Sequence, residues 1–123
     1  MRLALCAATL VITAACSNPT GSIAGPVAVR ATPPVLQLTN NTTAPVYAFV
    51  IERRAAAYTD WAPCTDAAAC PGIVSGATVA VPYGKIVGYT PAAREAIVYW
   101  WHLMPDGGSG FRPDSLRAVV VGL

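Results

Sequence analysis

Hydrophobic and polar positions alternate with a period of two along most of the chain after residue 34. This period places successive side chains on opposite faces, and it predicts β-strands where β-branched and aromatic residues are common. Proline, glycine and asparagine separate the alternating runs, which is typical of turns between strands. Strands are therefore predicted over residues 35–39, 46–53, 77–81, 96–103 and 117–123, with a weaker one over 85–89.

The alternating runs are short and follow one another at spacings of about 8–12 residues. Helical segments of no more than one turn are expected, near residues 55–57 and 91–94. Six or seven short strands in this arrangement resemble an antiparallel β-sandwich of the immunoglobulin-like kind, with a small β-barrel as the alternative. The Cys…Trp…Cys core of true immunoglobulins is absent, because Cys64 and Cys70 are too close in sequence to bridge two sheets. We predict an all-β fold with one small sandwich domain over residues 34–123.

The first part of the chain follows a different pattern. Residues from Leu3 to Ala15 form an uncharged, mostly apolar run that follows Arg2. A helix of this length rises about 20 Å at about 1.5 Å per residue, whereas the hydrocarbon core of a bilayer is about 30 Å thick. The run is too short to span a membrane but matches the apolar part of a secretory signal peptide, which predicts a signal peptide over residues 1–15.

Thr13, Ala14 and Ala15 lead directly into Cys16. This step of small residues ending in cysteine resembles the lipobox of bacterial lipoproteins. The resemblance implies cleavage just before Cys16, attachment of lipid such as palmitate to Cys16, and an anchor in a membrane of the cell envelope. Ser17 resembles the outer-membrane sorting preference of Gram-negative lipoproteins. Cleavage by an ordinary secretory peptidase is the alternative, and it would leave a soluble secreted or periplasmic protein.

Proline and glycine recur between Cys16 and Pro34. Such a stretch does not favour a helix, and it offers little apolar surface to bury. We therefore predict a flexible tether over residues 16–33, of which residues 27–30 are the part best suited to lie against the domain. A flexible coil of this length spans about 25 Å.

The chain contains four cysteines. Cys6 lies in the segment predicted to be removed, and the lipobox resemblance assigns Cys16 to lipid. Cys64 and Cys70 then remain as an even pair in an oxidising compartment, which predicts a disulfide. Redox pairs usually have two residues between the cysteines, and structural zinc needs four ligands, so a structural role is favoured.

The charged residues are balanced in number and scattered along the sequence. Eight lysines and arginines face six acidic residues, for a formal net charge of +2, and Arg2 lies in the segment predicted to be removed. No cluster of basic residues occurs along the sequence beyond Arg53 and Arg54. The sequence therefore indicates neither nucleic acid nor an anionic lipid surface as a partner.

Candidate chemistry is sparse. The chain has a single histidine, His102, and no recognisable Ser–His–Asp or Cys–His arrangement around it. The run from His102 to Met104 resembles the H-x-M element of periplasmic copper-binding lipoproteins, but those proteins supply several more Met and His ligands. We predict that the protein is not an enzyme and has no catalytic residues, metal site or cofactor.

Aromatic residues are the remaining candidates for ligand contact. Trp100 and Trp101 are successive strand residues, so they point to opposite faces and only one can face the core. The other is either covered, by residues 61–70 or by the tether, or exposed as a stacking surface for sugars or partner side chains. The candidate ligand-binding residues are Trp61, Trp100, Trp101 and His102.

Three short elements resemble the loops of the chagasin family of cysteine-protease inhibitors, which are also immunoglobulin-like domains. These elements are Asn18-Pro19-Thr20-Gly21, Gly107-Gly108-Ser109-Gly110 and Arg112-Pro113. The sequence as a whole predicts a lipid-anchored, non-enzymatic binding or assembly module that contacts an envelope protein or glycan. A protease inhibitor and a glycan-binding module with exposed aromatics are the alternatives.

Overall fold

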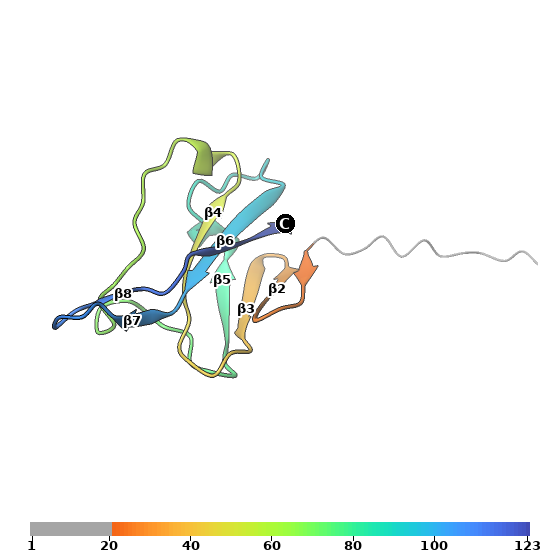
Figure 1. The fold of residues 1–123 in the computed structure, drawn as a ribbon. Helices are drawn as coiled ribbons and strands as arrows, with labels where there is room; N and C mark the ends of the chain where they lie inside the picture. The colour runs from red at the N-terminus through yellow and green to blue at the C-terminus, as the bar shows by residue number, and fades with distance from the viewer. Residues whose placement is uncertain (1–20) are drawn as a thin grey trace, which may run out of the picture.

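The structure is a computed structural model that describes residues 21–123 (Figure 1). The predicted signal peptide, Cys16 and the first three residues of the Asn18 element lie outside the described residues. The strands are β1 Ser22–Ile23, β2 Val27–Thr32, β3 Val35–Asn40, β4 Tyr47–Glu52, β5 Thr78–Pro82, β6 Glu95–Trp101, β7 Leu103–Pro105, β8 Phe111–Pro113 and β9 Arg117–Gly122. Two short 3₁₀ turns, η1 Ala55–Ala57 and η2 Tyr83–Lys85, complete the secondary structure.

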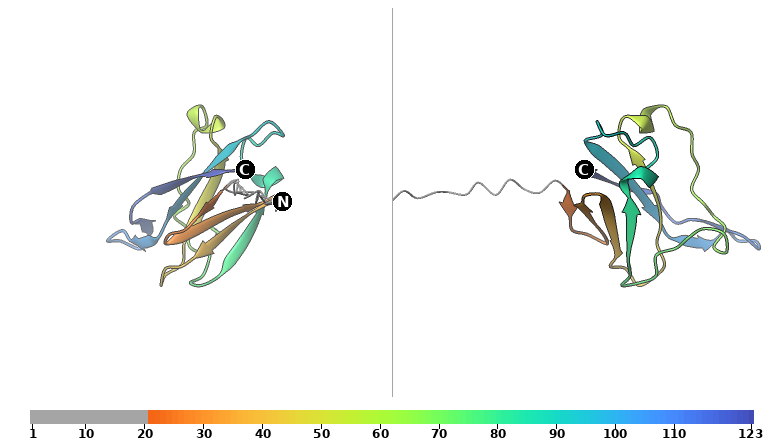
Figure 2. Two further views of the ribbon diagram at one scale, coloured as in Figure 1. Left: turned by 90° about the vertical axis from the view of Figure 1, so that its right-hand side faces the viewer. Right: turned by 180° about the vertical axis from the view of Figure 1, so that it is seen from behind.

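Two antiparallel sheets pack face to face (Figure 2). One has the strand order β1-β2-β3-β5, and the other has the order β4-β6-β9. A separate hairpin of β7 and β8 extends away from the sandwich. The predicted all-β fold, an antiparallel sandwich of the immunoglobulin-like kind, is confirmed. No helix in the described part of the chain has the length and apolar character that crossing a membrane requires.

Alternation along the strands builds the core between the sheets. Every second side chain of β2, β3 and β6 points inward and is buried, whereas its neighbours face outward. This pattern is the one expected for strands with one face against the opposite sheet. The buried inward residues include Val27, Val29, Leu36, Leu38, Val50, Ala96, Val98, Trp100 and Val121.

The tether prediction for residues 16–33 is wrong for residues 22–32, which form β1 and β2. Val27 and Val29 are each only 1% exposed and alternate with Ala28 and Arg30, so this segment has the pattern of a half-buried strand. Four of the prolines and glycines that suggested a coil lie in the turns at residues 24–26 and 33–34, namely Gly25, Pro26, Pro33 and Pro34. The domain therefore begins near Ser22 and not at residue 34.

Two further element predictions change. Residues 85–89 do not form a strand, because η2 and a turn at Gly88, which has a φ of +74°, interrupt the segment. The predicted strand over 96–103 divides at His102 into β6 and β7. The backbone N–H of His102 donates to the Asp114 side chain at 3.0 Å instead of joining the ladder.

Candidate functional site

Trp100 and Trp101 occupy opposite faces of β6 and are both buried. Trp100 faces the core and is 4% exposed, and the guanidinium carbon of Arg117 lies 4.5 Å from the centre of its ring. Trp101 lies on the outer face of the three-stranded sheet and is 2% exposed. The interpretation of these two tryptophans as ligand-stacking residues is therefore wrong, because neither presents a ring face to solvent.

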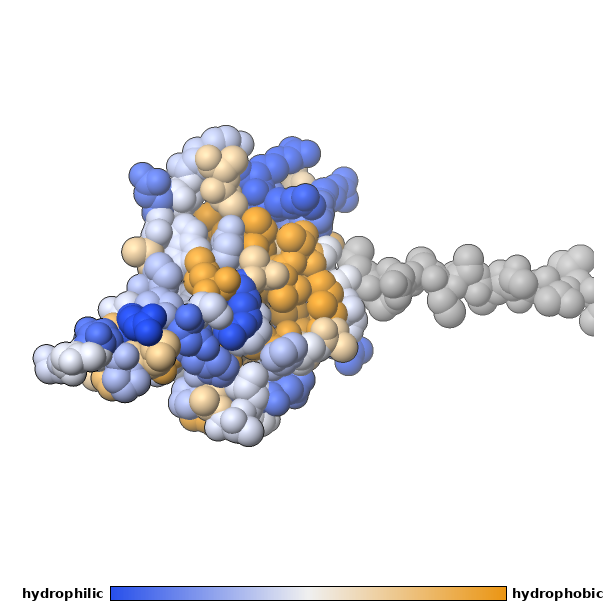
Figure 3. Space-filling model, in the orientation of Figure 1, coloured by the Kyte–Doolittle hydropathy of each residue, from blue (hydrophilic) through white to orange (hydrophobic). Residues whose placement is uncertain are grey.

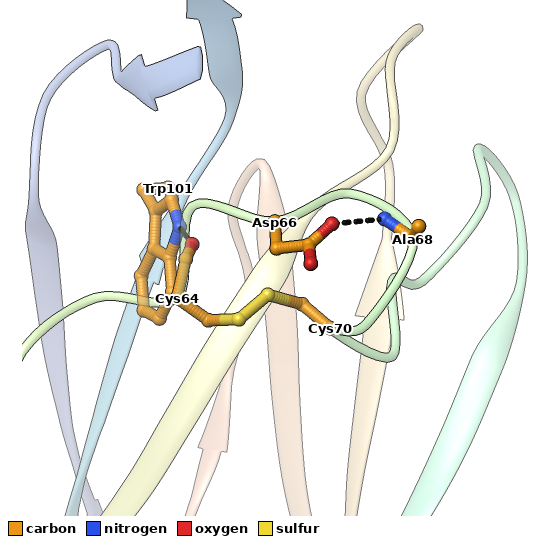
Figure 4. The surroundings of a disulfide bond; sticks show 5 residues. All are labelled: Cys64, Asp66, Ala68, Cys70 and Trp101. Atoms are coloured by element: carbon orange, nitrogen blue, oxygen red, sulfur yellow. Dashed lines mark hydrogen bonds between the residues drawn. A yellow bond between two sulfur atoms is a disulfide. The ribbon is translucent and has the colours of Figure 1, made fainter. Parts of the chain in front are cut away.

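Residues 61–70 cover Trp101. The Trp61 ring stacks on Phe49 with 4.4 Å between ring centres, and it lies 4.8 Å from Tyr99. The indole Nε1–H of Trp101 donates to the Cys64 carbonyl oxygen at 3.1 Å (Figure 4). The covered alternative for the outward tryptophan is confirmed, and Trp61 is half-buried as part of the cover.

The predicted disulfide between Cys64 and Cys70 is confirmed, with 6.1 Å between the two Cα atoms. Inside the loop, the Asp66 carboxylate accepts a hydrogen bond from the Ala68 N–H at 2.9 Å (Figure 4). The Asp66 carbonyl also accepts one from the Cys70 N–H at 2.8 Å. Cys70 is buried with Tyr47 and Trp101, so the disulfide loop acts as a small lid on the outer aromatic cluster.

The contacts of the His102 side chain are those of a structural residue. Its Nδ1 lies 2.9 Å from the Pro45 carbonyl oxygen, and its ring packs edge-on against Trp100. Within residues 21–123, no group of three or more His, Cys, Asp and Glu side chains gathers in a way that could hold a metal ion. His102 and the three tryptophans therefore do not converge on one ligand site.

The β7–β8 hairpin holds two of the elements that resemble protease-inhibitor loops. Gly107 to Gly110 form its turn, and Arg112 and Pro113 belong to β8. Phe111 is 45% exposed beside them. A cavity of about 420 Å³ separates the hairpin from the disulfide loop, and its walls include Asp66, Ala68 and Phe111.

A hydrogen bond at the C-terminal end of β9 shows which residues of this strand bond to β6 and which face the other way. The Leu123 N–H donates to the Arg94 carbonyl oxygen at 2.9 Å, next to the first register pair of β6 and β9. In an antiparallel pair, alternate residues bond to the partner strand and those between turn their N–H and C=O groups away. The odd-numbered residues of β9 therefore bond to β6, whereas Ala118 and Val120 direct their backbone groups to the opposite edge.

This outer edge of β9 has no partner strand among the described residues. Gly21 packs against the carbonyl of Gly122 and the side chain of Val121, which covers the C-terminal end of the strand. The strand carries Val119, Val120 and Val121 in succession and contains neither lysine nor proline. A long, apolar edge of this kind is a template for pairing with another strand.

The other sheet edges are protected. The edge strand β1 has only two residues, and β5 ends in a proline. The outer edge of β4 is occupied by the backbone of Val87. The Glu52 N–H donates to the Val87 carbonyl at 2.8 Å, and the Val87 N–H donates to the Val50 carbonyl at 3.2 Å. Short length, proline and coverage are the usual means of blocking edge pairing, and within residues 21–123 none of them protects Ala118 and Val120 of β9.

Apolar side chains adjoin the β9 edge. Val120 is 40% exposed and Leu116 is 47% exposed, and Ile97 lies half-buried opposite Val120 in the register. Figure 3 shows hydrophobic residues gathered over β9 and the strands beside it. The free edge and these side chains together form the candidate site, which we call the β9 edge. The sequence predicted a strand over residues 117–123, but only the pairing of β9 with β6 reveals the free edge.

Comparison of the chain with protein-family models, with curated proteins and with solved structures found no match.

Proposed function

We propose that this protein is a lipid-anchored, non-enzymatic component of the cell envelope that binds a protein partner along the β9 edge. The observation that carries the proposal is the row of outward backbone groups at Ala118 and Val120. An extended partner segment placed there would add a fourth strand to the β4-β6-β9 sheet. Main-chain hydrogen bonds provide the affinity in this mode, and alternate side-chain contacts provide the specificity.

The apolar surface beside the edge defines the partner further. Val120 and Leu116 are exposed, and no charged side chain occurs in β9 after Arg117. A strand that pairs here would place an apolar side chain against Val120 on the outer face of the sheet. The proposed partner is therefore an envelope protein with an extended segment of alternating apolar and polar residues.

The lipid anchor is supported by the lipobox resemblance at Cys16. A non-enzymatic role is supported by the single histidine, whose ring is engaged with Pro45 and Trp100. Both statements are proposals, and the anchor has a direct test. Mass spectrometry of the N-terminal peptide is expected to find acyl mass on Cys16. A mature N-terminus without it would contradict the anchor and leave the β9 edge to be tested by itself.

The β9 edge is tested with a photo-crosslinking amino acid at Ala118 in cells that produce the protein, with Thr78 on β5 as the matched exposed edge position. A discrete adduct is expected from position 118 and not from position 78. Val120→Pro removes an outward N–H without touching the bonds to β6, so it is expected to abolish the adduct. Val120→Thr retains the N–H and is expected to preserve it.

Equal adducts from positions 118 and 78 would contradict pairing at the β9 edge. An adduct that survives Val120→Pro would also contradict it. Circular dichroism and a thermal melt of Val120→Pro establish that the variant keeps its strands.

Protease inhibition is the second candidate function. It is favoured by the projecting β7–β8 hairpin, which presents Phe111, Arg112 and the glycine turn away from the sandwich. Titration of a papain-like protease with the domain tests it, and Phe111→Ala is expected to weaken any inhibition. Glycan binding loses its main support because Trp100 and Trp101 are buried. Of the three candidate tryptophans, the half-buried Trp61 is the one that remains accessible for that function.

A further inference from the structure

The two ends of the described chain meet at one end of the sandwich. The Gly21 carbonyl accepts a hydrogen bond from Ala31 at 2.7 Å, and Gly21 also packs against Gly122. The Leu123 N–H bonds to the Arg94 carbonyl. Figures 1 and 2 show β1 beside the C-terminal end of β9. Residues 1–20 therefore join the domain at the same end as the loop that precedes β6.

Basic side chains gather at this end from segments that are distant in sequence. The turn between β2 and β3 lies here, next to Gly21, and η2 joins it because the Tyr83 N–H donates to the Pro34 carbonyl at 2.8 Å. The end of β4 also lies at this end of the sandwich, because the Arg53 N–H donates to the carbonyl of Glu95, the first residue of β6, at 3.1 Å. We call this surface the basic end, and its exposed cations are Arg30, Arg53, Arg54, Lys85 and Arg94.

The carboxylates of the basic end are already engaged. Glu95 accepts a hydrogen bond from the Arg53 guanidinium at 2.8 Å. Backbone N–H groups of Arg54 and Ala55 donate to Glu52, and these hydrogen bonds hold the pKa of Glu52 below its usual value. Among residues 21–123, neither Arg54 nor Arg94 forms an ion pair.

An open cavity of about 430 Å³ lies between these charged side chains, and its walls are formed by three arginines and two glutamates: Arg53, Arg54, Arg94, Glu52 and Glu95. Figure 3 shows hydrophilic residues gathered above the C-terminal end of β9. Arg54 and Arg94, which form no ion pair within residues 21–123, are suited to bind the phosphate groups of an anionic ligand at this hollow.

Three of the four aspartates within residues 21–123 lie away from the basic end. Asp66 is in the disulfide loop, Asp106 is in the β7–β8 hairpin and Asp114 follows β8, all beyond the opposite end of β6. The domain therefore has a charge asymmetry along the strand direction, which the small net charge of the whole chain conceals.

We propose that the basic end binds anionic phospholipid headgroups and orients the domain on the bilayer. The β7–β8 hairpin and the disulfide loop then point away from the membrane. The orientation rests on the proposed lipid anchor. Only Ser17 to Thr20 separate Cys16 from Gly21, so the chain between them spans at most about 18 Å. Such a short link holds the basic end near the range of about 8 Å over which charges act at physiological salt.

The test uses the chain from Ser17 to Leu123, which lacks the lipid-bearing cysteine but retains every strand and core side chain described above. Sedimentation with vesicles of equimolar phosphatidylglycerol and phosphatidylcholine is compared with vesicles of phosphatidylcholine alone. Binding is expected only to the anionic vesicles, and added salt is expected to reverse it. The variant with Arg54→Gln and Arg94→Gln together is expected to partition about 25-fold less, at about fivefold per arginine.

Arg112→Gln is the matched control for Arg54→Gln, because it removes the same charge from an exposed residue at the opposite end. It is expected to leave vesicle binding unchanged. Equal losses for the two single variants would overturn the proposal, since net charge and not the basic end would then control binding. Retention on heparin without vesicle binding would also overturn it.

The vesicle experiment needs no acylation. A failure of the anchor, detected by mass spectrometry at Cys16, is therefore distinguishable from a failure of the basic end.

Discussion

The indole N–H of Trp101 and the carbonyl of Cys64 form a hydrogen bond of 3.1 Å that joins the end of β6 to the disulfide loop. Trp101 is the last residue of its strand, and its ring lies on the outer face of the sheet, where water would otherwise contact it. The disulfide holds the loop in the position that accepts this bond. Sheet, tryptophan and disulfide therefore form one cooperative unit outside the main core.

Removing the disulfide tests this unit. The variant with Cys64→Ser and Cys70→Ser is expected to lose about 2 kcal/mol of unfolding free energy, because the short ring no longer restricts the unfolded chain. Urea unfolding measures the loss. Far-ultraviolet circular dichroism is expected to stay constant, while tryptophan fluorescence shifts to the red as Trp101 gains water. An unchanged fluorescence maximum would show that the loop covers Trp101 without the disulfide.

Asn40 is fully buried, and both the nitrogen and the oxygen of its side-chain amide form hydrogen bonds. Its Nδ2 donates to the carbonyls of Ala44 and Ile73, each at 2.8 Å, and its Oδ1 accepts from the Thr42 N–H at 2.8 Å. Asn40→Ala is expected to cost about 2–4 kcal/mol of stability, because several buried polar groups lose their partners. Asn41→Ala, at the exposed neighbouring position, is the control and is expected to cost less than about 1 kcal/mol. Equal midpoints in urea for the two variants would contradict this prediction.

Asp114 makes stability depend on acid pH. Burial raises its pKa, but hydrogen bonds from Ser115 and His102 and the nearby Arg117 outweigh burial, so the pKa lies below the usual value. A carboxyl with a lowered folded pKa stabilises the protein above its unfolded pKa, about 3.9 for aspartate. That contribution is lost as the pH falls through the folded pKa.

Asp114→Asn is therefore expected to be less stable than the parent protein by about 1 kcal/mol near neutral pH. The difference is expected to shrink as the pH falls through the lowered folded pKa of Asp114, because the parent side chain then becomes protonated as well. Urea unfolding across this range measures both effects. Asp60→Asn, at an exposed aspartate, serves as the control. A difference between Asp114→Asn and the parent that stays constant with pH would show that packing, and not ionisation, is responsible.

Both the backbone conformation at position 88 and the closeness of Ala55 require a glycine there. Its φ of +74° lies in the left-handed region, and a Cβ at this position would meet the Ala55 side chain in η1. Gly88→Ala is expected to lower stability by about 1–2 kcal/mol. Gly84→Ala is the matched control, because its added methyl group would meet no atom within 4 Å. A thermal melt compares them, and similar melting temperatures would be inconsistent with this account.

The strand predictions succeeded where alternation was long and failed where turn residues were dense. Residues 96–101 form an uninterrupted run of apolar and aromatic residues, and they form the central strand of their sheet. Residues 22–32 contain the same alternation at Val27, Val29 and Ala31, but flanking prolines and glycines made the segment resemble a coil. Only the opposite sheet, which buries these three side chains, makes them part of the core.

The candidate site could be predicted less well than the fold. Trp100 and Trp101 were correctly expected on opposite faces, because side chains alternate in any strand. That both are buried depends on contacts with distant residues such as Trp61 and Arg117. The β9 edge was invisible in the sequence, since a free edge is a property of strand order.

The sequence by itself determined the all-β class, most of the strand positions and the pairing of Cys64 with Cys70, because these depend on local periodicity and cysteine number. Tertiary structure alone decided which strand has a free edge, which aromatic residues are covered, and that Arg53, Arg54 and Arg94 share one end of the domain. The physical reason is that these properties arise from contacts between segments far apart in the chain, and local patterns carry no information about which distant segments meet.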